Sequence, residues 1–275
     1  MDNRDCTGFL QWALAQRDFR WPGFRKVRRQ VCKRLSRRIH ELGLADFTAY
    51  RRRLEADPAE WTAFDSCCVV TISRFYRDRS VYETLRERVL PEIAARAVRE
   101  GRMARIWSAG CASGEEPYTL KVIWDCDVAR SFPDASVLIA ATDVDDTVLA
   151  RARRGCFEPT SLSELPPQLI RQAFDRAGPL YCIKPKHREG IEFLHQDLRR
   201  GGPARTFDLV LCRNVAFTYF AEPLQRLVLR GIMDRLAPHG YLVIGTHERP
   251  PSVEPTVRPL CGAPQIFERT EVAKH

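Results

Sequence analysis

The chain has 275 residues, 44% of them hydrophobic and 29% charged, with a formal net charge of +9 at pH 7. This hydrophobic share can fill a sizeable core, which indicates a soluble globular protein. No run approaches the roughly 18 to 20 apolar residues of a membrane-spanning helix, and charges interrupt the N-terminal stretch where a signal peptide would be apolar, so we expect a cytoplasmic protein without membrane insertion.

Residues 1–85 show helical periodicity interrupted by polar breaks, which predicts an N-terminal helical domain. Its helical segments cover residues 8–16, 24–44, 44–57 and 58–70. Asp46 is placed to cap the third segment, and Pro58 suits the first turn of the fourth.

The second of these segments, residues 24–44, is strongly basic. Its apolar residues recur at steps of three and four and predict one buried helix face: Phe24, Val27, Val31, Leu35 and Ile39. Its cations fall between them: Arg25, Lys26, Arg28, Arg29, Lys33, Arg34, Arg37 and Arg38. This charge pattern fits either a solvated face or a surface for an acidic partner, which would be a nucleic acid, an acidic protein or anionic lipid.

Residues 86–275 are predicted to form an α/β domain. Residues 79–102 read as a linking helix that ends near Gly101. Strand-like apolar runs then alternate with helical patterns, the strands at 104–109, 136–145, 207–215 and 240–246 and the helices at 115–130, 145–155 and 222–238. This alternation predicts a doubly wound parallel sheet, which binds ligands at the carboxyl ends of its strands. Residues 177–196 are expected to form a small inserted β hairpin.

The ten cysteines are scattered through the chain, mostly in apolar runs. No C-x-x-C pair is present, and no histidine stands at the spacing of a zinc ligand. We therefore expect reduced cysteines that pack as small hydrophobic residues, and no metal site.

The first strand leads into the sequence IWSAGCASGEEPY at residues 106–118. A dinucleotide-binding fold would carry G-x-G-x-x-G here, whereas this chain has G-x-x-x-G followed by Glu115 and Glu116. Acids in the first turn of a helix often do no more than interact favourably with the helix dipole. The alternative is that one of the two binds a cation. A ligand with a nucleoside and an amino group but no phosphate, such as S-adenosylmethionine, would account for both the glycines and the acids.

Polar residues also follow the next strands. Asp143 ends the second strand, where an acid can hold the two hydroxyls of a ribose. Arg213 and Asn214 end the strand at 207–215 and are either loop residues or site residues, and their place at the expected pocket favours the site. For Arg77, in TISRFYRD, the local pattern leaves a snorkelling and a functional role open.

These motifs, in this order behind a basic helical module, closely resemble the CheR family of bacterial chemotaxis receptor methyltransferases. The resemblance covers nearly all of residues 20–270 and rests on four stretches: RFYRD, IWSAGCASGEEPYTL, ATDVDDTVLARARRGCF and FDLVLCRNVAFTYF. It implies a Rossmann-like methyltransferase domain that uses S-adenosylmethionine, behind an all-helical domain.

The resemblance also implies roles for single residues. Around the cofactor, it places Glu115 at the methionine amino group, Asp143 at the ribose, and Asp197 with Leu198 at the adenine. Further cofactor-binding residues carried over from the family motifs are Thr71, Ser73, Arg77, Gly110, Arg213 and Asn214. For catalysis, the family motif places Arg77 near the transferred methyl group, and Tyr219 matches a tyrosine that helps to place the acceptor.

The activity that the resemblance implies is methyl-ester formation on protein glutamates. A free glutamate has a pKa of about 4.3, so at neutral pH the acceptor is already an anion and needs no catalytic base. The expected partners are the cytoplasmic helices of chemoreceptors, bound by the basic helix through Arg28, Arg29, Arg34, Arg37 and Arg38. We expect a monomer, and we do not expect a nucleic-acid substrate.

The chain departs from the family pattern at four places. Thr71 replaces a common Asn, the segment NVAFTYF is one residue longer than usual, the sequence GTHE ending in Glu248 replaces GHSE, and the hairpin at 177–196 is short. These departures keep two alternatives open. One is a carboxyl methyltransferase of the same family that acts on a non-chemotaxis protein or a small-molecule acceptor, and the other is a non-catalytic cofactor-binding regulator.

Overall fold

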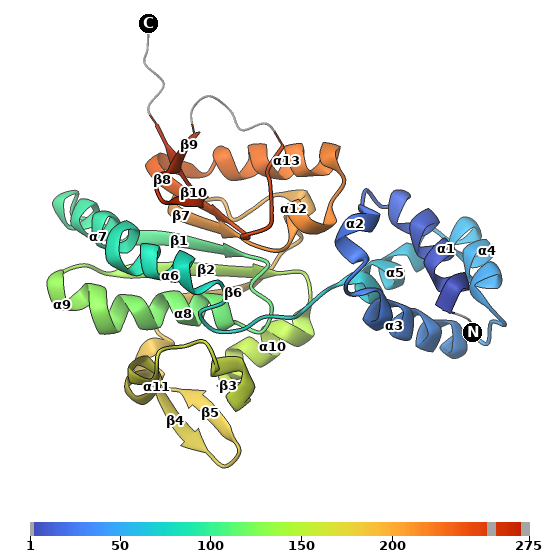
Figure 1. The fold of residues 1–275 in the computed structure, drawn as a ribbon, viewed down its shortest axis with the longest axis horizontal. Helices are drawn as coiled ribbons and strands as arrows, with labels where there is room; N and C mark the ends of the chain where they lie inside the picture. Colours follow the sequence, from blue (N-terminus) through green and yellow to red (C-terminus); the bar gives the residue numbers. More distant parts are fainter. Residues whose placement is uncertain (1–2, 252–256, 271–275) are drawn as a thin grey trace, which may run out of the picture. The chain divides into compact units, whose positions relative to one another are not determined.

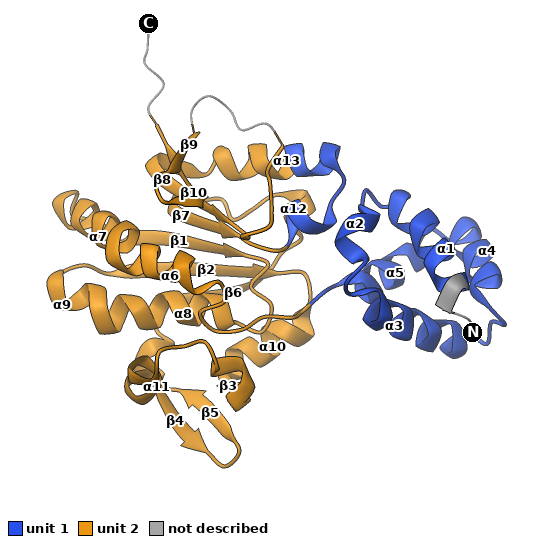
Figure 2. Cartoon of the chain, in the orientation of Figure 1, with its two compact units in different colours: residues 1–70, 215–226 blue, residues 71–214, 227–275 orange. Residues whose placement is uncertain are grey.

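The computed structural model describes residues 3–251 and 257–270. It divides into two compact units, Met1–Val70 with Val215–Arg226, and Thr71–Asn214 with Leu227–His275 (Figure 2). We call them the helical unit and the α/β unit. The sequence pattern placed this boundary near residue 85, whereas the division in the structure falls after Val70. The predicted linking helix is part of the α/β unit, because its apolar side packs into the core of that unit.

The helical unit is built from short helices: α1 (Asn3–Ala15), α2 (Trp21–Phe24), α3 (Arg28–Glu41), α4 (Phe47–Ala56), α5 (Glu60–Cys68) and α12 (Ala216–Tyr219). The predicted cap is confirmed, since the Asp46 side chain accepts a hydrogen bond from the Ala49 N–H at 2.7 Å. Pro58 precedes the first residue of α5, Glu60, so its placement in the first turn was wrong.

The basic segment forms α2 and α3 with a turn between them. Val31, Leu35 and Ile39 are fully buried, as the three- and four-residue spacing predicted, and Phe24 joins them in the core of the helical unit. The segment 215–226 also belongs to this unit. Gly23 of α2 lies so close to α12 that a Cβ atom there would meet the Thr218 carbonyl oxygen at 2.1 Å.

The α/β unit contains a seven-stranded sheet with the order β6-β2-β1-β7-β8-β10-β9 (Figure 1). Its strands are β1 (Ala104–Ala109), β2 (Val137–Asp143), β6 (Ile191–His195), β7 (Phe207–Cys212), β8 (Leu236–Ile244), β9 (Val257–Leu260) and β10 (Ala263–Arg269). The parallel pairing is confirmed from β6 to β8. The sheet is not parallel throughout, because β10 pairs antiparallel with both β8 and β9. A short turn joins β9 to β10, and so short a connection permits only antiparallel pairing.

The helices of this unit follow the predicted alternation. They are α6 (Arg79–Thr84), α7 (Leu90–Arg99), α8 (Glu115–Ile123), α9 (Ala129–Ser131), α10 (Asp146–Arg154), α11 (Pro167–Ala173) and α13 (Glu222–Met233), the last shared with the helical unit. Single π-helical turns, η1 (Leu85–Val89) and η2 (Trp124–Val128), join α6 to α7 and α8 to α9. Three 3₁₀ turns complete the elements, η3 (Pro159–Leu162), η4 (Pro185–His187) and η5 (Leu198–Arg200). α7 packs on β1, and α8 and α10 pack on β2.

The inserted β element differs from the predicted hairpin at 177–196. It is a three-stranded sheet of β3 (Cys156–Phe157), β4 (Phe174–Ala177) and β5 (Leu180–Ile183), in the order β3-β5-β4. The run IEFLH, which we included in the hairpin, instead forms β6 at the edge of the main sheet and pairs with β2. A short apolar run carries no sign of which sheet it joins, so local pattern could not separate them.

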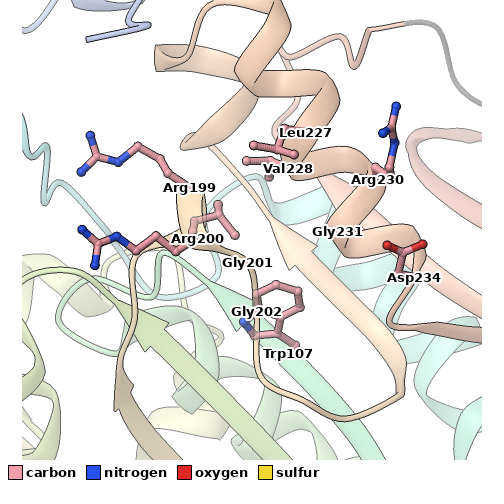
Figure 3. A pocket seen from close by; sticks show the side chains of 11 residues that line it. Trp107, Arg199, Arg200, Gly201, Gly202, Leu227, Val228, Arg230, Gly231 and Asp234 are labelled. Carbon is pink, nitrogen blue, oxygen red and sulfur yellow. The ribbon is translucent and has the colours of Figure 1, made fainter.

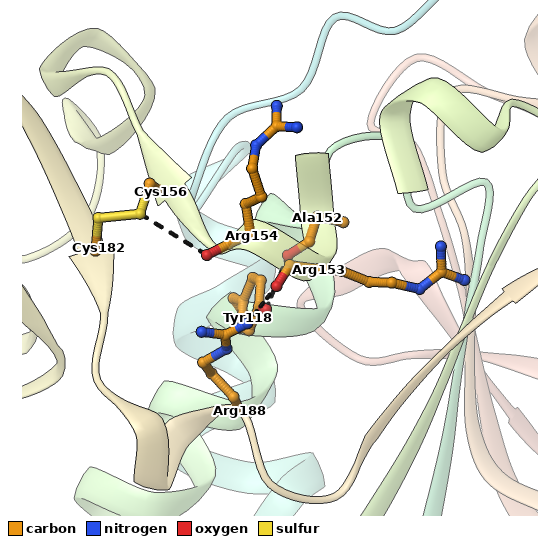
Figure 4. Close-up of a disulfide and its surroundings, with 7 residues drawn as sticks. All are labelled: Tyr118, Ala152, Arg153, Arg154, Cys156, Cys182 and Arg188. Carbon is orange, nitrogen blue, oxygen red and sulfur yellow. Dashed lines mark hydrogen bonds between the residues drawn. A yellow bond between two sulfur atoms is a disulfide. The ribbon is translucent and has the colours of Figure 1, made fainter. Parts of the chain in front are cut away.

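Four cysteines form disulfides, so the expectation of reduced cysteines was wrong for them. Cys6 pairs with Cys32 in the helical unit, and Cys156 pairs with Cys182 between β3 and β5. Each pair is separated by 26 positions in the sequence and is brought together only by tertiary structure. Beside the second pair, the Tyr118 hydroxyl donates to the Ala152 carbonyl at the end of α10 (Figure 4).

Membrane-spanning helices and metal sites are two features that the sequence did not predict. No helix in the described ranges is long and apolar enough to cross a membrane. Within the same ranges, no group of three or more histidine, cysteine or acidic side chains is arranged to hold a metal ion.

Candidate functional site

The loop between β1 and α8 is shaped by left-handed backbone conformations at Gly110, Ala112 and Gly114. The N–H groups of Gly110 and Cys111 both donate to the Thr142 carbonyl of β2 (2.8 and 2.9 Å), which holds the loop over the ends of the two strands. At Gly114 a Cβ atom would lie 3.0 Å from the Cβ of Ala152 in α10, so only glycine fits without displacement. The predicted cofactor residue Gly110 thus belongs to a tightly folded loop.

Asp143 fixes this loop from the end of β2. Its Oδ2 accepts a hydrogen bond from the Ala112 N–H at 2.9 Å, and its Oδ1 accepts one from the Asp145 N–H at 3.1 Å. The side chain is 9% exposed, and burial raises the pKa of its carboxyl group. Each carboxylate oxygen has a second lone pair, so Asp143 retains the capacity to accept hydrogen bonds from the hydroxyls of a ribose.

Glu115 begins α8 and is only 5% exposed. Its Oε2 atom is buried without a hydrogen-bond partner among the described residues. Burial raises the pKa of this carboxyl group, and a backbone hydrogen bond and the positive charge of Arg151 oppose this in part. A buried carboxylate oxygen without a partner is costly, and an ammonium group would relieve that cost. The carboxylate therefore fits the amino group of S-adenosylmethionine. The predicted site residue Ser73 is half-buried in the segment before α6.

The neighbouring acid, Glu116, has partners of its own. Its Oε1 accepts a hydrogen bond from the Ser108 hydroxyl at 2.7 Å, and its Oε2 accepts one from Arg213 at 3.3 Å. Burial raises the pKa of Glu116, and the positive charge of Arg213 opposes this. Of the two acids that the local sequence pattern left open, Glu115 is the one with a carboxylate oxygen left for a cation.

Arg213 lies directly after β7 and is 7% exposed. Its guanidinium donates to the Arg77 carbonyl oxygen and to Asp78, both at 2.7 Å, and to the Tyr82 hydroxyl at 3.1 Å. The structure therefore brings two predicted site residues, Arg77 and Arg213, into contact. Asp78 and Tyr82 were missed by the sequence analysis, because nothing local marks them as partners of a residue more than 130 positions away.

Asn214 adopts a left-handed conformation at the end of the same strand. Its N–H donates to Glu248 Oε2 at 2.9 Å, and the Gly245 N–H donates to the same oxygen at 2.7 Å. The acid of the unusual GTHE sequence thus joins the end of β7 to the end of β8. The sequence marks Glu248 only as a departure from the family pattern, because its hydrogen bond with the Asn214 N–H links residues that are distant in the chain.

The predicted adenine residues follow β6. Asp197 caps η5 and is bound by Arg199, whose Nη2 lies 2.8 Å from Oδ2. Burial would raise the pKa of Asp197, but its hydrogen bonds with Arg199 outweigh this and lower it. Leu198 lines a cavity of about 230 Å³ together with Trp107 of β1 and Val228 of α13 (Figure 3). The cavity has both apolar and charged lining, the charged residues being Arg199, Arg200, Arg230 and Asp234.

The remaining predicted site residues lie in different units. Thr71 is the first residue of the α/β unit and is half-buried. Arg77 is also half-buried, and its side chain donates a hydrogen bond to the Ile72 carbonyl at 3.2 Å. Tyr219 belongs to the helical unit, where its ring lies 5.0 Å from that of Phe24 and its carbonyl accepts a hydrogen bond from the Arg20 N–H. The catalytic role of Tyr219 stays a prediction.

The five predicted docking arginines differ in their surroundings. Arg38 donates two hydrogen bonds to the buried Glu60 (2.9 and 2.8 Å), and Arg34 donates to the carbonyl oxygens of Cys67 and Val69. Arg28 donates to the Thr7 hydroxyl at 3.3 Å.

The other two, Arg29 and Arg37, are exposed, and Arg37 lies 3.6 Å from Glu41 on the same helix. The structure thus separates arginines that hold the helical unit together from arginines that face solvent.

The chain is similar to known proteins over most of its length. The family model described as CheR methyltransferase, SAM binding domain, matches residues 71–264, and the model described as CheR methyltransferase, all-alpha domain, matches residues 26–64. The chemotaxis protein methyltransferase of Listeria innocua is 32% identical over 203 residues, 74% of this chain and 74% of that protein. That of Escherichia coli is 32% identical over 232 residues, 80% of this chain and 76% of that protein.

Two further similarities are more limited. An uncharacterized 104.1 kDa protein of Rhodobacter capsulatus is 32% identical over 218 residues, and the chain spans only 23% of its length. Among solved structures, the N-methyltransferase NodS from Bradyrhizobium japonicum is 16% identical, with 68% of this chain and 97% of that chain covered and a TM-score of 0.37.

The matched family models cover most of the chain and include both its helical and its S-adenosylmethionine-binding parts. The two predicted cofactor acids stand next to neighbouring strands, because Glu115 begins α8, which follows β1, and Asp143 ends β2. The chain therefore belongs to the CheR family of S-adenosylmethionine-dependent methyltransferases.

Proposed function

We propose that this chain methylates glutamate side chains of chemoreceptors and forms glutamate methyl esters. The observation that carries the cofactor part of the proposal is the buried Glu115 carboxylate, whose Oε2 has no hydrogen-bond partner among the described residues. When bound, S-adenosylmethionine supplies an electrophilic methyl group. Glu115 would hold its amino group, Asp143 its ribose, and Leu198 with Trp107 the adenine.

The chemistry of the side chains supports a carboxylate acceptor. A glutamate with a pKa of about 4.3 is already ionised at neutral pH, so the enzyme has no proton to remove. The residues at and next to the strand ends include the acids Glu115 and Asp143 together with Arg213 and Asn214, which can bind and orient groups. Such a site works by alignment of the reacting atoms within about 3 to 3.5 Å and by removal of water from the acceptor.

For receptor docking we propose the solvent-facing arginines of the basic helix, Arg29 and Arg37. Their charge would attract acidic receptor helices, and the attraction would weaken as salt rises. We also propose that the chain acts as a monomer in the cytoplasm. The names of the relatives, chemotaxis protein methyltransferases, support the receptor as the substrate class.

The test uses S-adenosylmethionine labelled on its methyl group and a panel of chemoreceptor cytoplasmic fragments. We expect label on a receptor fragment that base releases as methanol, and its loss in the Arg77→Ala variant. Binding of S-adenosylmethionine without label on any receptor would contradict the receptor assignment and favour another carboxylate acceptor or a non-catalytic regulator. Docking is tested by Arg29→Glu with Arg37→Glu, which should weaken receptor binding at low salt.

A further inference from the structure

The segment that carries Arg77, residues 71–78, contains neither helix nor strand. Two of its residues, Tyr76 and Asp78, adopt left-handed backbone conformations with φ of 58° and 63°. Such conformations are unfavourable for residues other than glycine and persist only where surrounding contacts enforce them. The position of Arg77, which stands between these two residues, therefore depends on what holds the segment.

The two residues before Arg77, Phe75 and Tyr76, are held by the core. The Phe75 N–H donates to the Ser161 carbonyl at 3.0 Å, and the Phe75 ring packs edge-on against Phe157. The Tyr76 N–H donates to the Thr119 hydroxyl at 3.2 Å, and that hydroxyl donates to the Glu115 carbonyl at 2.6 Å. The backbone before Arg77 is thereby connected to the first turn of α8.

The last two residues of the segment, Arg77 and Asp78, are held by Arg213. One guanidinium nitrogen, Nη2, donates both to the Arg77 carbonyl and to the Asp78 carboxylate at 2.7 Å. The other, Nη1, donates to the Tyr82 hydroxyl and to Glu116, and the guanidinium lies 5.1 Å from the centre of the Tyr82 ring. One planar cation therefore joins the end of β7, the start of α8 and the two residues on either side of the Arg77–Asp78 peptide bond.

We propose that Arg213 is a positioning residue, which fixes the direction of the Arg77 side chain through the Arg77 carbonyl and Asp78. This proposal differs from the direct cofactor contact that the sequence resemblance implied for Arg213. The proposal rests on the proposed function in one respect: that function places Arg77 near the reacting methyl group. A lysine at this position keeps the positive charge, but its ammonium group lacks the planar guanidinium geometry that donates to several partners at once.

The first experiment compares Arg213→Lys with Arg96→Lys by calorimetric binding of S-adenosylmethionine in the absence of any acceptor. Arg96 is a matched control in the same unit, because it also donates to a backbone carbonyl, that of His239, and to a buried carboxylate, that of Asp208. We expect at least tenfold weaker binding for Arg213→Lys and no change for Arg96→Lys. Equal affinities of Arg213→Lys and the unchanged protein would overturn the proposal.

A double-mutant cycle separates positioning from general structural damage. If Arg213 acts through Arg77, the variant with both Arg77→Ala and Arg213→Lys should bind no more weakly than Arg77→Ala alone. Losses that add would overturn the proposal. Amide exchange provides a structural readout, since residues 72–78 should exchange faster in Arg213→Lys while β1 and β7 keep their protection.

If Arg213→Lys does not fold, Tyr82→Phe replaces it, because this variant keeps the aromatic ring and removes only the hydroxyl that Arg213 contacts. It should give a smaller loss of affinity in the same direction, together with faster exchange of residues 72–78. Unchanged binding and exchange in Tyr82→Phe would count against the proposal. Since no acceptor is present in these measurements, failure of glutamate methylation alone would leave their result unaffected.

Discussion

The carboxylate of Asp143 accepts a hydrogen bond from the backbone N–H of Ala112, a non-glycine residue in a left-handed conformation. Asp143 thus shapes the loop after β1, and we propose that it also binds the ribose. Asp143→Asn should weaken S-adenosylmethionine binding by at least tenfold in calorimetry, because an amide presents only one oxygen acceptor. The control is Asp145→Asn, since asparagine can also cap α10 and should leave binding unchanged. Equal losses in both variants would contradict the special role of Asp143.

At Glu115, the charge that should bind the cofactor is expected to lower the stability of the fold. Glu115→Gln is expected to lose S-adenosylmethionine affinity, because its amide cannot pair with an ammonium group. It is also expected to raise the melting temperature at neutral pH, because burial raises the pKa of Glu115 and its charge therefore opposes folding.

The sign of this pH dependence follows from the raised pKa. Below the ordinary pKa of about 4.3 the carboxyl is protonated in both the folded and unfolded states, so the variant should have no advantage there. The advantage should grow as the pH rises from that value to the raised folded pKa. Thermal denaturation of both proteins across this range checks it, and an advantage that is largest at acidic pH would refute the assignment.

Arg38 and Arg37 are adjacent in sequence but should respond differently to the same substitution. Arg38→Ala removes two of the three side-chain hydrogen bonds to the buried Glu60 and leaves only that from the Tyr50 hydroxyl, which should cost about 1 to 3 kcal/mol of unfolding free energy. Arg37→Ala removes an exposed side chain and should change stability by less than about 0.5 kcal/mol. Urea denaturation distinguishes the two.

The Arg38–Glu60 pair should also contribute to acid sensitivity. The hydrogen bonds from Arg38 hold the pKa of Glu60 below its ordinary value, so its stabilisation is present above the unfolded pKa and is lost as the pH falls through the lower folded pKa. Arg38→Ala should flatten this part of the stability profile. A similar effect of Arg37→Ala would contradict the separation of structural from solvent-facing arginines.

Gly23→Ala tests the assignment of the 215–226 segment to the helical unit. The added methyl group would overlap the Thr218 carbonyl, so α2 and α12 must move apart at a cost of about 1 to 3 kcal/mol. Gly8→Ala is the control: a Cβ atom there meets nothing within 4 Å, and alanine favours the helix. Thermal melting should show a loss for the first variant and a gain or no change for the second.

The Cys156–Cys182 disulfide should stabilise the small β sheet. Closure of a loop with a sequence separation of 26 is worth about 3.5 kcal/mol in the chain-entropy model. The double variant Cys156→Ser with Cys182→Ser, or treatment with a dithiol reductant, should therefore lower the melting temperature. Cys261→Ser changes an exposed free cysteine and should have no effect. Insensitivity of the melting temperature to the double variant would show that the bond contributes nothing to stability.

The sequence predicted the features that depend on local pattern. The apolar face of α3, the cap of Asp46 and the strands β1, β2, β7 and β8 follow from periodicity and capping chemistry. The features that it missed depend on contacts between distant residues. The disulfides, the antiparallel β10, the place of IEFLH in the main sheet and the partners of Arg213 have no local signal. For the same reason the sequence could not tell Arg38, which pairs with Glu60, from Arg37.

The central claim is tested most directly by mass spectrometry of a chemoreceptor cytoplasmic fragment after incubation with this chain and S-adenosylmethionine. The account predicts base-labile methyl esters on glutamate side chains, formed by the unchanged protein and lost in Arg77→Ala. Methyl groups on amines or on a nucleic acid would contradict it. So would a receptor fragment that stays unmodified under conditions in which calorimetry shows the cofactor bound.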